Sequence, residues 1–333
     1  MTPKIGIVEG FDWRREDALD GHWGELRPEE RVYLVSAMHT WGFDTFLYDP
    51  RALRRENADP AKRLQEPDHW PITFDAARDH QVDFVWGLAP GADGPAPGLF
   101  DGVERLLDLV ASGVALLFDD LPGEADEGQV RAQGHLARNL EARFPGVVKA
   151  FRSRCAHAGA PLASVIPKLL DEELPESVAL FWSSADKKAK TLEHVVFPDL
   201  ERRSVWVWDD ALTVDSTDPA AASLGPLAGR TPDILDGVGG WMLDAYFPFA
   251  RSIAPMAVAG LLATGRVQPD DAIDALVNVW ARWFHDVPRD AFRALVGVSA
   301  GTLESKELVP FRESLASKPG LRELVDHWCP AEH

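Results

Sequence analysis

The chain has 333 residues, of which 46% are apolar, and its formal net charge is −19. This composition can fill a sizeable core, and the length is within the range of an α/β barrel. Nucleic acids and anionic membrane surfaces bind clustered Lys and Arg, so the negative charge argues against both as main partners. No apolar run is long enough to span a membrane, and the first residues lead directly into an expected strand, so we expect no secretory signal.

Short apolar runs bounded by turn residues alternate with helical patterns through the first 264 residues. The expected strands are Ile5–Glu9, Thr45–Tyr48, Asp83–Leu88, Val114–Phe118, Leu162–Ile166, Val178–Trp182, Val205–Trp208 and Val238–Leu243. The helical patterns between them are Glu29–Trp41, Phe74–His80, Leu99–Ala111, Gln129–Phe144, Lys187–His194 and Ile253–Thr264. Buried strands separated by helices predict a parallel sheet covered on both faces, which we interpret as a (β/α)8 TIM barrel. The alternative is an open doubly wound sheet, although the glycine-rich fingerprint expected after its first strand is missing.

Beyond Gly265 the strand patterns stop. The helical patterns there are Asp270–Phe284, Arg289–Val298, Glu307–Ser317 and Leu321–Trp328. We therefore expect two parts, a barrel over residues 1–264 and a helical C-terminal extension over residues 265–333.

The segment Val114–Asp120 ends in two adjacent carboxylates, Asp119 and Asp120. Successive side chains of a strand point to opposite faces, so a barrel interior cannot hold two ionised aspartates in series. The pair is tolerable where the strand opens into a polar cleft, and barrel enzymes keep their chemistry at the carboxyl ends of their strands. The alternative interpretation is an Asp-Asp turn that caps the next helix.

Acidic and aromatic residues follow other expected strands as well. These strand ends are Glu9-Gly10-Phe11-Asp12, Tyr48-Asp49-Pro50-Arg51, Trp208-Asp209-Asp210 with Asp215 beyond it, and Asp244-Ala245-Tyr246. Carboxylates accept hydrogen bonds from hydroxyls, and indole packs on the C–H face of a sugar, so this set suits a sugar better than a phosphate. Among the twelve tryptophans, Trp208 is the best candidate for such a platform. Glu9 is interpreted as a buried, hydrogen-bonded barrel residue, with a catalytic role as the alternative.

The sequence favours no metal and no cofactor. Its ten histidines show no spacing typical of a helix-borne zinc site, and the Gly-Pro-rich segment Ala89–Pro97 lacks the lysine of a phosphate-binding loop. The two cysteines, Cys155 and Cys329, lie far apart without metal-ligand spacing, which favours a reducing cytoplasm.

Four stretches resemble the family 84 glycoside hydrolases, the group of O-GlcNAcases and bacterial β-N-acetylglucosaminidases. Val8–Phe11 resembles the family's Glu-Gly-Phe-Tyr-Gly motif, and Thr45–Arg51 its Asn-Thr-Tyr-Ile-Tyr-Ala-Pro-Lys segment. Ala115–Asp120 is similar to its catalytic strand Ala-Leu-Leu-Phe-Asp-Asp-Ile. Val207–Asp210, Asp215 and Leu224–Arg230 together match its Trp-Asp-Asn … Asp … Leu-Gly-Pro-Tyr-x-Gly-Arg block. The matches keep their order over about residues 4–264.

The resemblance implies a retaining mechanism assisted by the substrate, which would be a β-linked N-acetylhexosamine of a glycan or glycoconjugate. Asp119 would orient and polarise the 2-acetamido group, whose oxygen attacks the anomeric carbon. Asp120 would protonate the leaving oxygen and then activate water. The expected substrate-binding residues are Gly10, Arg51, Trp208, Asp210, Asp215 and Tyr246.

The departures from the family pattern leave a second function open. Asp12 stands where the family has tyrosine, and Arg51 where it has lysine. Asp210 and Tyr246 both stand where the family has asparagine. Alignment through Pro167 puts Leu170 at the position of a tyrosine that bonds the acetamido group. The alternative is therefore a catalytically altered or inactive family member that binds glycans or a protein partner. We also expect the Arg51 guanidinium to contact a pocket carboxylate, that of Asp210, Asp49 or Asp215.

Overall fold

The computed structural model of the chain describes residues 2–9, 26–49, 69–90, 98–109, 111–119, 126–153, 165–183, 200–212, 224–227, 229–245, 249–318 and 320–330. Several sequence-based predictions lie outside these residues. They concern Gly10, Asp12, Arg51, Asp120, Cys155, Asp215, Tyr246 and the helix Lys187–His194.

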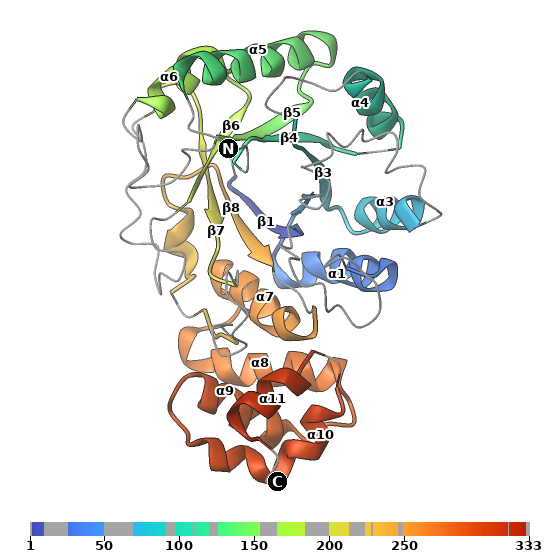
Figure 1. The fold of residues 1–333 in the computed structure, drawn as a ribbon, viewed down its shortest axis with the longest axis vertical. Helices are drawn as coiled ribbons and strands as arrows, with labels where there is room; N and C mark the ends of the chain where they lie inside the picture. The colour runs from blue at the N-terminus through green and yellow to red at the C-terminus, as the bar shows by residue number, and fades with distance from the viewer. Residues whose placement is uncertain are drawn as a thin grey trace.

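Parallel strands close into a barrel in chain order, with helices around it (Figure 1). The strands are β1 (Lys4–Glu9), β2 (Thr45–Tyr48), β3 (Asp83–Leu88), β4 (Gly113–Leu117), β5 (Val148–Arg152), β6 (Ala179–Ser183), β7 (Val205–Asp209) and β8 (Gly240–Ala245). β1 pairs with both β2 and β8, which closes the sheet and rules out the open alternative. The predicted (β/α)8 barrel is confirmed.

Alternate side chains of the strands fill the barrel, because a strand presents every second residue to the same face. One buried cluster consists of Val8, Leu47, Val85, Ala115, Leu117, Ala150, Ala179, Phe181, Trp206, Trp208 and Met242. The intervening residues pack under the surrounding helices in a second, larger cluster. The interior is therefore a packed core, and polar groups have room only where the strands end.

The helices around the barrel are α1 (Pro28–Trp41), α3 (His69–Asp79), α4 (Leu99–Asp108), α5 (Glu127–Arg143), α6 (Ile166–Glu173) and α7 (Phe249–Ala263), with the 3-10 turn η3 (Pro232–Leu235) before β8. Local signals set their ends. α1 begins at Pro28, where proline is tolerated, and stops before Gly42, whose φ of 93° suits glycine. Asp126 caps α5 by accepting a hydrogen bond from the Gln129 N–H at 2.8 Å.

All the expected strands overlap observed ones except the fifth. The prediction that Leu162–Ile166 forms the fifth strand is wrong, because the fifth strand of the barrel is Val148–Arg152 and Ile166 is the first residue of α6. Residues 162–164 lie outside the described part of the chain. Lys149 and Arg152 interrupt the continuous apolar run expected of a buried parallel strand. Leu170, which the alignment through Pro167 put at a tyrosine position, lies buried within α6.

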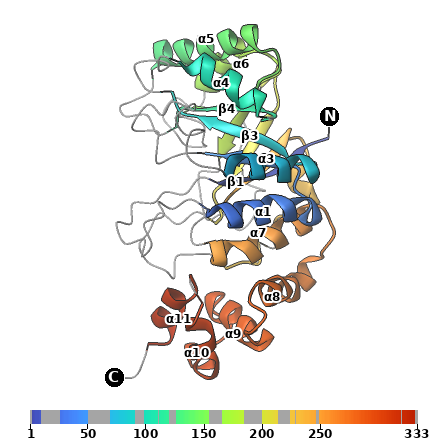
Figure 2. The ribbon, with the colours of Figure 1, turned by 90° about the vertical axis from the view of Figure 1, so that its right-hand side faces the viewer.

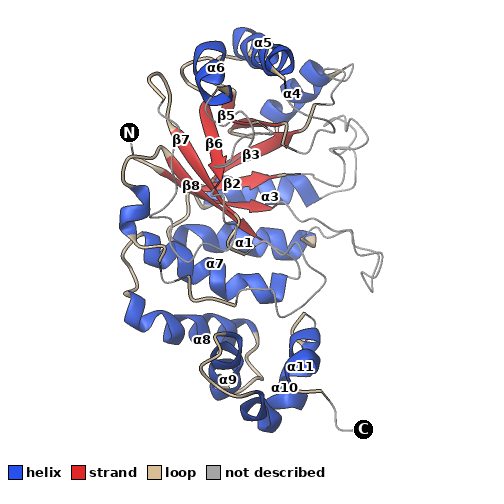
Figure 3. Cartoon of the chain, turned by 60° about the vertical axis from the view of Figure 1, so that its left-hand side comes forward, coloured by secondary structure: helices blue, strands red, loops and turns tan. Residues whose placement is uncertain are grey.

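The chain continues beyond α7 in short helices on one side of the barrel (Figures 2 and 3). They are η4 (Pro269–Asp271), α8 (Ala272–Trp283), α9 (Arg289–Ser299), η5 (Ser305–Phe311), α10 (Arg312–Ala316) and α11 (Arg322–Trp328). Trp280 on α8 donates its Nε1–H to the Ala250 carbonyl at 2.9 Å, and Arg251 on α7 pairs with Glu323 on α11 at 2.8 Å. The residues of α8 share one hydrophobic cluster with α7. The proposed boundary after residue 264 falls at the end of α7, and treating residues 265–333 as a separate part stays a prediction.

Arg203 ties α6 to the start of β6 and β7. Its side chain is fully buried and donates to the Asp171 carboxylate at 2.9 Å. It also donates to backbone carbonyls at the end of α6 and after it, those of Asp171, Leu174, Pro175 and Val178. Because the last carbonyls of a helix have no partner within the helix, one guanidinium here satisfies several otherwise unpaired acceptors.

We predict that Arg203→Leu lowers the free energy of unfolding by about 3–5 kcal/mol, because it leaves the Asp171 carboxylate buried without its cation. Urea unfolding measures the loss. The control is Arg202→Leu at the neighbouring position, where the arginine pairs with Glu176 at the exposed surface and should be nearly dispensable. Equal losses for the two variants would contradict this prediction.

Candidate active site

The carboxyl ends of β4 to β8 bring a set of polar side chains to one end of the barrel. Asp119 follows β4, Arg152 ends β5, Ser183 ends β6, Trp208 lies in β7 and Asp244 lies in β8. In a closed barrel of parallel strands these ends lie on a single rim, so residues far apart in sequence become neighbours.

The Arg152 guanidinium joins Asp119 to Trp208. Its Nη1 lies 3.2 Å from Oδ2 of Asp119, and its central carbon lies 3.7 Å from the centroid of the Trp208 ring. Its Nη2 donates to Ser183 Oγ at 3.4 Å. The side chains of Arg152 and Asp119 are only 12% and 15% exposed, so this ion pair is weakly screened by solvent.

Trp208 is held by acidic neighbours on its other edge. Its Nε1–H is shared between Oδ1 of Asp210 at 3.2 Å and Oδ2 of Asp244 at 3.1 Å. Phe181 packs against the ring edge-to-face at 5.1 Å. Two carboxylates on the indole N–H make the ring more electron-rich, which favours a cation over its face.

A second buried ion pair fixes the end of β7. Arg230 donates to both oxygens of Asp209 at 2.9 Å, and the Trp241 Nε1–H reaches Oδ2 of the same carboxylate at 2.9 Å. Such a two-point contact restrains the carboxylate in orientation as well as position. Arg230 comes from the Leu224–Arg230 stretch, so this motif holds in place the strand that carries Trp208.

Glu9 has a partner of its own at the end of β1. Arg31 on α1 donates from Nε and Nη2 to the two Glu9 oxygens at 2.7 and 2.6 Å, and the Leu26 N–H donates to Oε1 at 3.0 Å. The guanidinium also lies 4.6 Å from the Trp70 ring centroid. Both charged side chains are almost fully buried, which favours the structural interpretation of Glu9 over the catalytic one.

Of the predicted site residues, the structure brings together Asp119, Trp208 and Asp210, through Arg152 and through the Trp208 N–H. Arg51 lies outside the described residues, so its expected contact with a pocket carboxylate stays a prediction. Trp208 is 1% exposed with Arg152 over its ring, so the open platform expected from the sequence is not the arrangement seen. Sequence reasoning missed Arg152, although the turn at Gly146 followed by Val147, Val148, Ala150 and Phe151 was a strand signal in the right place.

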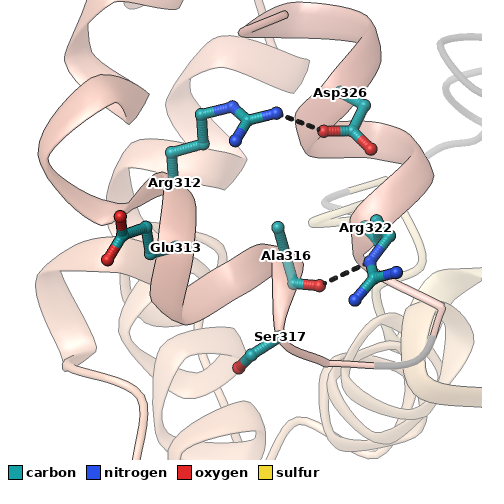
Figure 4. A pocket seen from close by; sticks show the side chains of 6 residues that line it. All are labelled: Arg312, Glu313, Ala316, Ser317, Arg322 and Asp326. Atoms are coloured by element: carbon teal, nitrogen blue, oxygen red, sulfur yellow. Dashed lines mark hydrogen bonds and ion pairs between the residues drawn. The ribbon is translucent and has the colours of Figure 1, made fainter. Parts of the chain in front are cut away.

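Among the described residues no group of three His, Cys, Asp or Glu side chains is arranged to hold a metal ion. A surface pocket in the extension, between α10 and α11, is lined by Arg312, Glu313, Ala316, Ser317, Arg322 and Asp326 (Figure 4). There Arg312 pairs with Asp326 and Arg322 donates to the Ala316 carbonyl, so the contacts serve to join the two helices. None of the helices in the part of the chain described is long and apolar enough to cross a membrane.

The fold and the rim together define a (β/α)8 barrel with carboxylates and an indole at the carboxyl ends of its strands, the arrangement that barrel enzymes use for their active sites. No family model matches the chain. It is 24% identical to Protein O-GlcNAcase of Rattus norvegicus, and equally to that of Mus musculus, over 273 residues. These alignments cover 73% of this chain but only 28% of each relative's length.

A solved structure, that of CpGH84B, superposes with a TM-score of 0.63 at 14% sequence identity. The superposition covers 97% of this chain and 65% of CpGH84B. The sequence matches and the shared fold agree with each other. The resemblance to family 84 glycoside hydrolases, inferred from four short motifs, is thereby confirmed.

We predict that the Asp209–Arg230 pair is strongly coupled. Arg230→Gln should lower the free energy of unfolding by about 3–5 kcal/mol, because Asp209 then stays buried without its cation. The double variant with Asp209→Asn should recover part of that loss, and urea unfolding of the four proteins gives the coupling energy.

The matched control is the exposed pair Arg293–Asp274, where the same cycle should give at most about 1 kcal/mol. A coupling for Asp209–Arg230 no larger than that of the control would show that the pair does not fix the end of β7.

Proposed function

We propose that the chain is a retaining β-N-acetylhexosaminidase that acts on a β-linked N-acetylhexosamine, N-acetylglucosamine in the first instance, of a glycan or glycoconjugate. The observation that carries the proposal is the position of Asp119, which matches the family's polarising aspartate. It stands at the carboxyl end of β4, at the same end of the barrel as Trp208 and Asp210. The curated relatives are named as O-GlcNAcases, which supports the same substrate class.

The adjacency of Asp119 and Asp120 supports assistance by the substrate. An ordinary retaining glycosidase places two carboxyl groups about 5 Å apart on opposite sides of the scissile bond, one of them as nucleophile. Two consecutive residues at a strand end do not straddle a sugar in that way. In our proposal the acetamido oxygen of the substrate attacks the anomeric carbon, Asp119 orients that group, and Asp120 protonates the leaving oxygen. Asp120 then takes a proton from the water that opens the cyclic intermediate.

The substrate-binding residues in this proposal are Gly10, Arg51, Trp208, Asp210, Asp215 and Tyr246. The buried Trp208 ring supports the Arg152 guanidinium, which lies over its face. Asp210 accepts from the Trp208 N–H, and we assign its carboxylate to sugar hydroxyls as well. The reaction needs no cofactor, since the nucleophile belongs to the substrate and both proton transfers belong to Asp120. We place the protein in the cytoplasm. The substrate class of its relatives is compatible with that compartment, and so is the free, buried thiol of Cys329.

A second candidate is a family member that binds glycans or a protein partner without cleaving them. One observation favours it. Positions that the resemblance assigns to sugar contacts are changed in this chain, with Arg51 in place of a lysine and Asp210 and Tyr246 in place of asparagines.

Assay with a β-N-acetylglucosaminide that carries a poor, natural-like leaving group tests the proposal. We expect measurable hydrolysis by the wild type and a fall of about 10²–10⁴ in rate for Asp120→Asn, because general acid catalysis contributes that much. Asp126→Asn is the matched control. It removes one aspartate from the start of α5, where asparagine caps a helix equally well, and should leave the rate unchanged.

Two outcomes decide between the candidates. Equal rates for wild type and Asp120→Asn would refute the hydrolase. Sugar binding in calorimetry, with no product from the wild type, would establish the binder in its place.

A further inference from the structure

The Arg152 side chain contacts both an aromatic ring and a carboxylate at the rim of the barrel. The guanidinium lies over the Trp208 ring at 3.7 Å and holds Oδ2 of Asp119 at 3.2 Å. The contact with the ring places the guanidinium carbon against Trp208, and the ion pair places the Asp119 carboxylate beside the same guanidinium. A lysine ammonium is a point charge without the planar surface that packs on an aromatic ring.

The charges around Asp119 explain why a cation belongs there. The described titratable groups at this end of the barrel are Glu9 on β1, Asp49 after β2, Asp119 after β4, Arg152 on β5, Asp209 and Asp210 at the end of β7, and Asp244 on β8. β6 contributes the Ser183 hydroxyl. Glu9 and Asp209 are matched by Arg31 and Arg230. Arg152 therefore lies among several acidic side chains, and the one it contacts is Asp119. In the sequence Asp119 is followed directly by a second aspartate, Asp120.

We propose that Arg152 is a positioning residue that keeps Asp119 ionised and oriented for the acetamido group, while Asp120 holds the proton. This inference rests on the proposed function. In that reaction the acetamido nitrogen becomes positive as its oxygen attacks, so Asp119 must be a carboxylate. The leaving oxygen needs a proton, so Asp120 must be the acid. Repulsion between two neighbouring carboxyl groups favours the state in which one of them keeps a proton, and their surroundings decide which one. Arg152 favours the ionised form on the Asp119 side.

The first test compares the pH profiles of kcat/KM for wild type, Arg152→Met and Arg152→Lys, since such profiles report the essential ionisations of the free enzyme. A carboxylate that loses a nearby cation takes up a proton at higher pH. We therefore expect the acidic limb of Arg152→Met to move up by about 1 to 3 pH units. Arg152→Lys, which keeps the charge without the plane, should move less.

Lys149→Met is the matched control. It removes one positive charge from the same strand, but its ammonium bonds to the Gly146 carbonyl near the start of β5, at the opposite end of the barrel. Its profile should coincide with the wild type. Thermal melting of each variant at neutral pH confirms that the proteins compared are folded.

A second readout does not depend on hydrolysis. The carboxyl carbon of Asp119, labelled with ¹³C and assigned by its loss in Asp119→Asn, is titrated by NMR in wild type and Arg152→Met. A midpoint that rises in the variant supports the inference even if the wild type cleaves no substrate, which would refute the proposed function alone. An unchanged midpoint, or an acidic limb that stays in place, overturns the role of Arg152 whatever the wild-type activity.

Discussion

Closure of the parallel barrel is the constraint on which the rest of this structure depends. Pairing of β1 with β8 brings all the strand ends to one rim, and the sequence places carboxylates at most of those ends. The closed sheet satisfies the backbone hydrogen bonds, but it also crowds negative charge into a small, partly buried region. Three of these carboxylates, those of Glu9, Asp119 and Asp209, pair with an arginine from another element of the fold.

Three arginines provide that compensation from three different elements. Arg31 on α1 holds Glu9, Arg230 before η3 holds Asp209, and Arg152 on β5 holds Asp119. The first two pairs are almost fully buried, and in each the guanidinium donates two hydrogen bonds to the carboxylate, which suits a structural role. The third pair is more exposed, and its arginine lies on the face of the Trp208 ring.

The fold is shared with CpGH84B at 14% identity, a level at which the packing pattern is kept while most side chains differ. The O-GlcNAcase relatives are far longer than this chain, which spans 28% of their length. Two of the sequence motifs that resemble family 84 lie at strand ends of the barrel, one with Asp119 after β4 and one with Trp208, Asp209 and Asp210 at the end of β7.

The sequence by itself determined the alternation of strands and helices and favoured a barrel, because short apolar strands and helical periodicity are local patterns that one segment displays without its neighbours. Closure of the sheet, which ruled out the open alternative, was decided by the pairing of β1 with β8. The sequence also determined that Asp119 and Trp208 stand at strand ends. The sequence did not predict the fifth strand correctly, because Lys149 and Arg152 interrupt its apolar run. The more apolar segment Leu162–Ile166 was predicted instead. Only the tertiary structure decided which charges meet: Arg152 with Asp119, Arg230 with Asp209, and Arg31 with Glu9. Pairing between strand ends depends on the register and closure of the whole sheet, and no single segment carries that information.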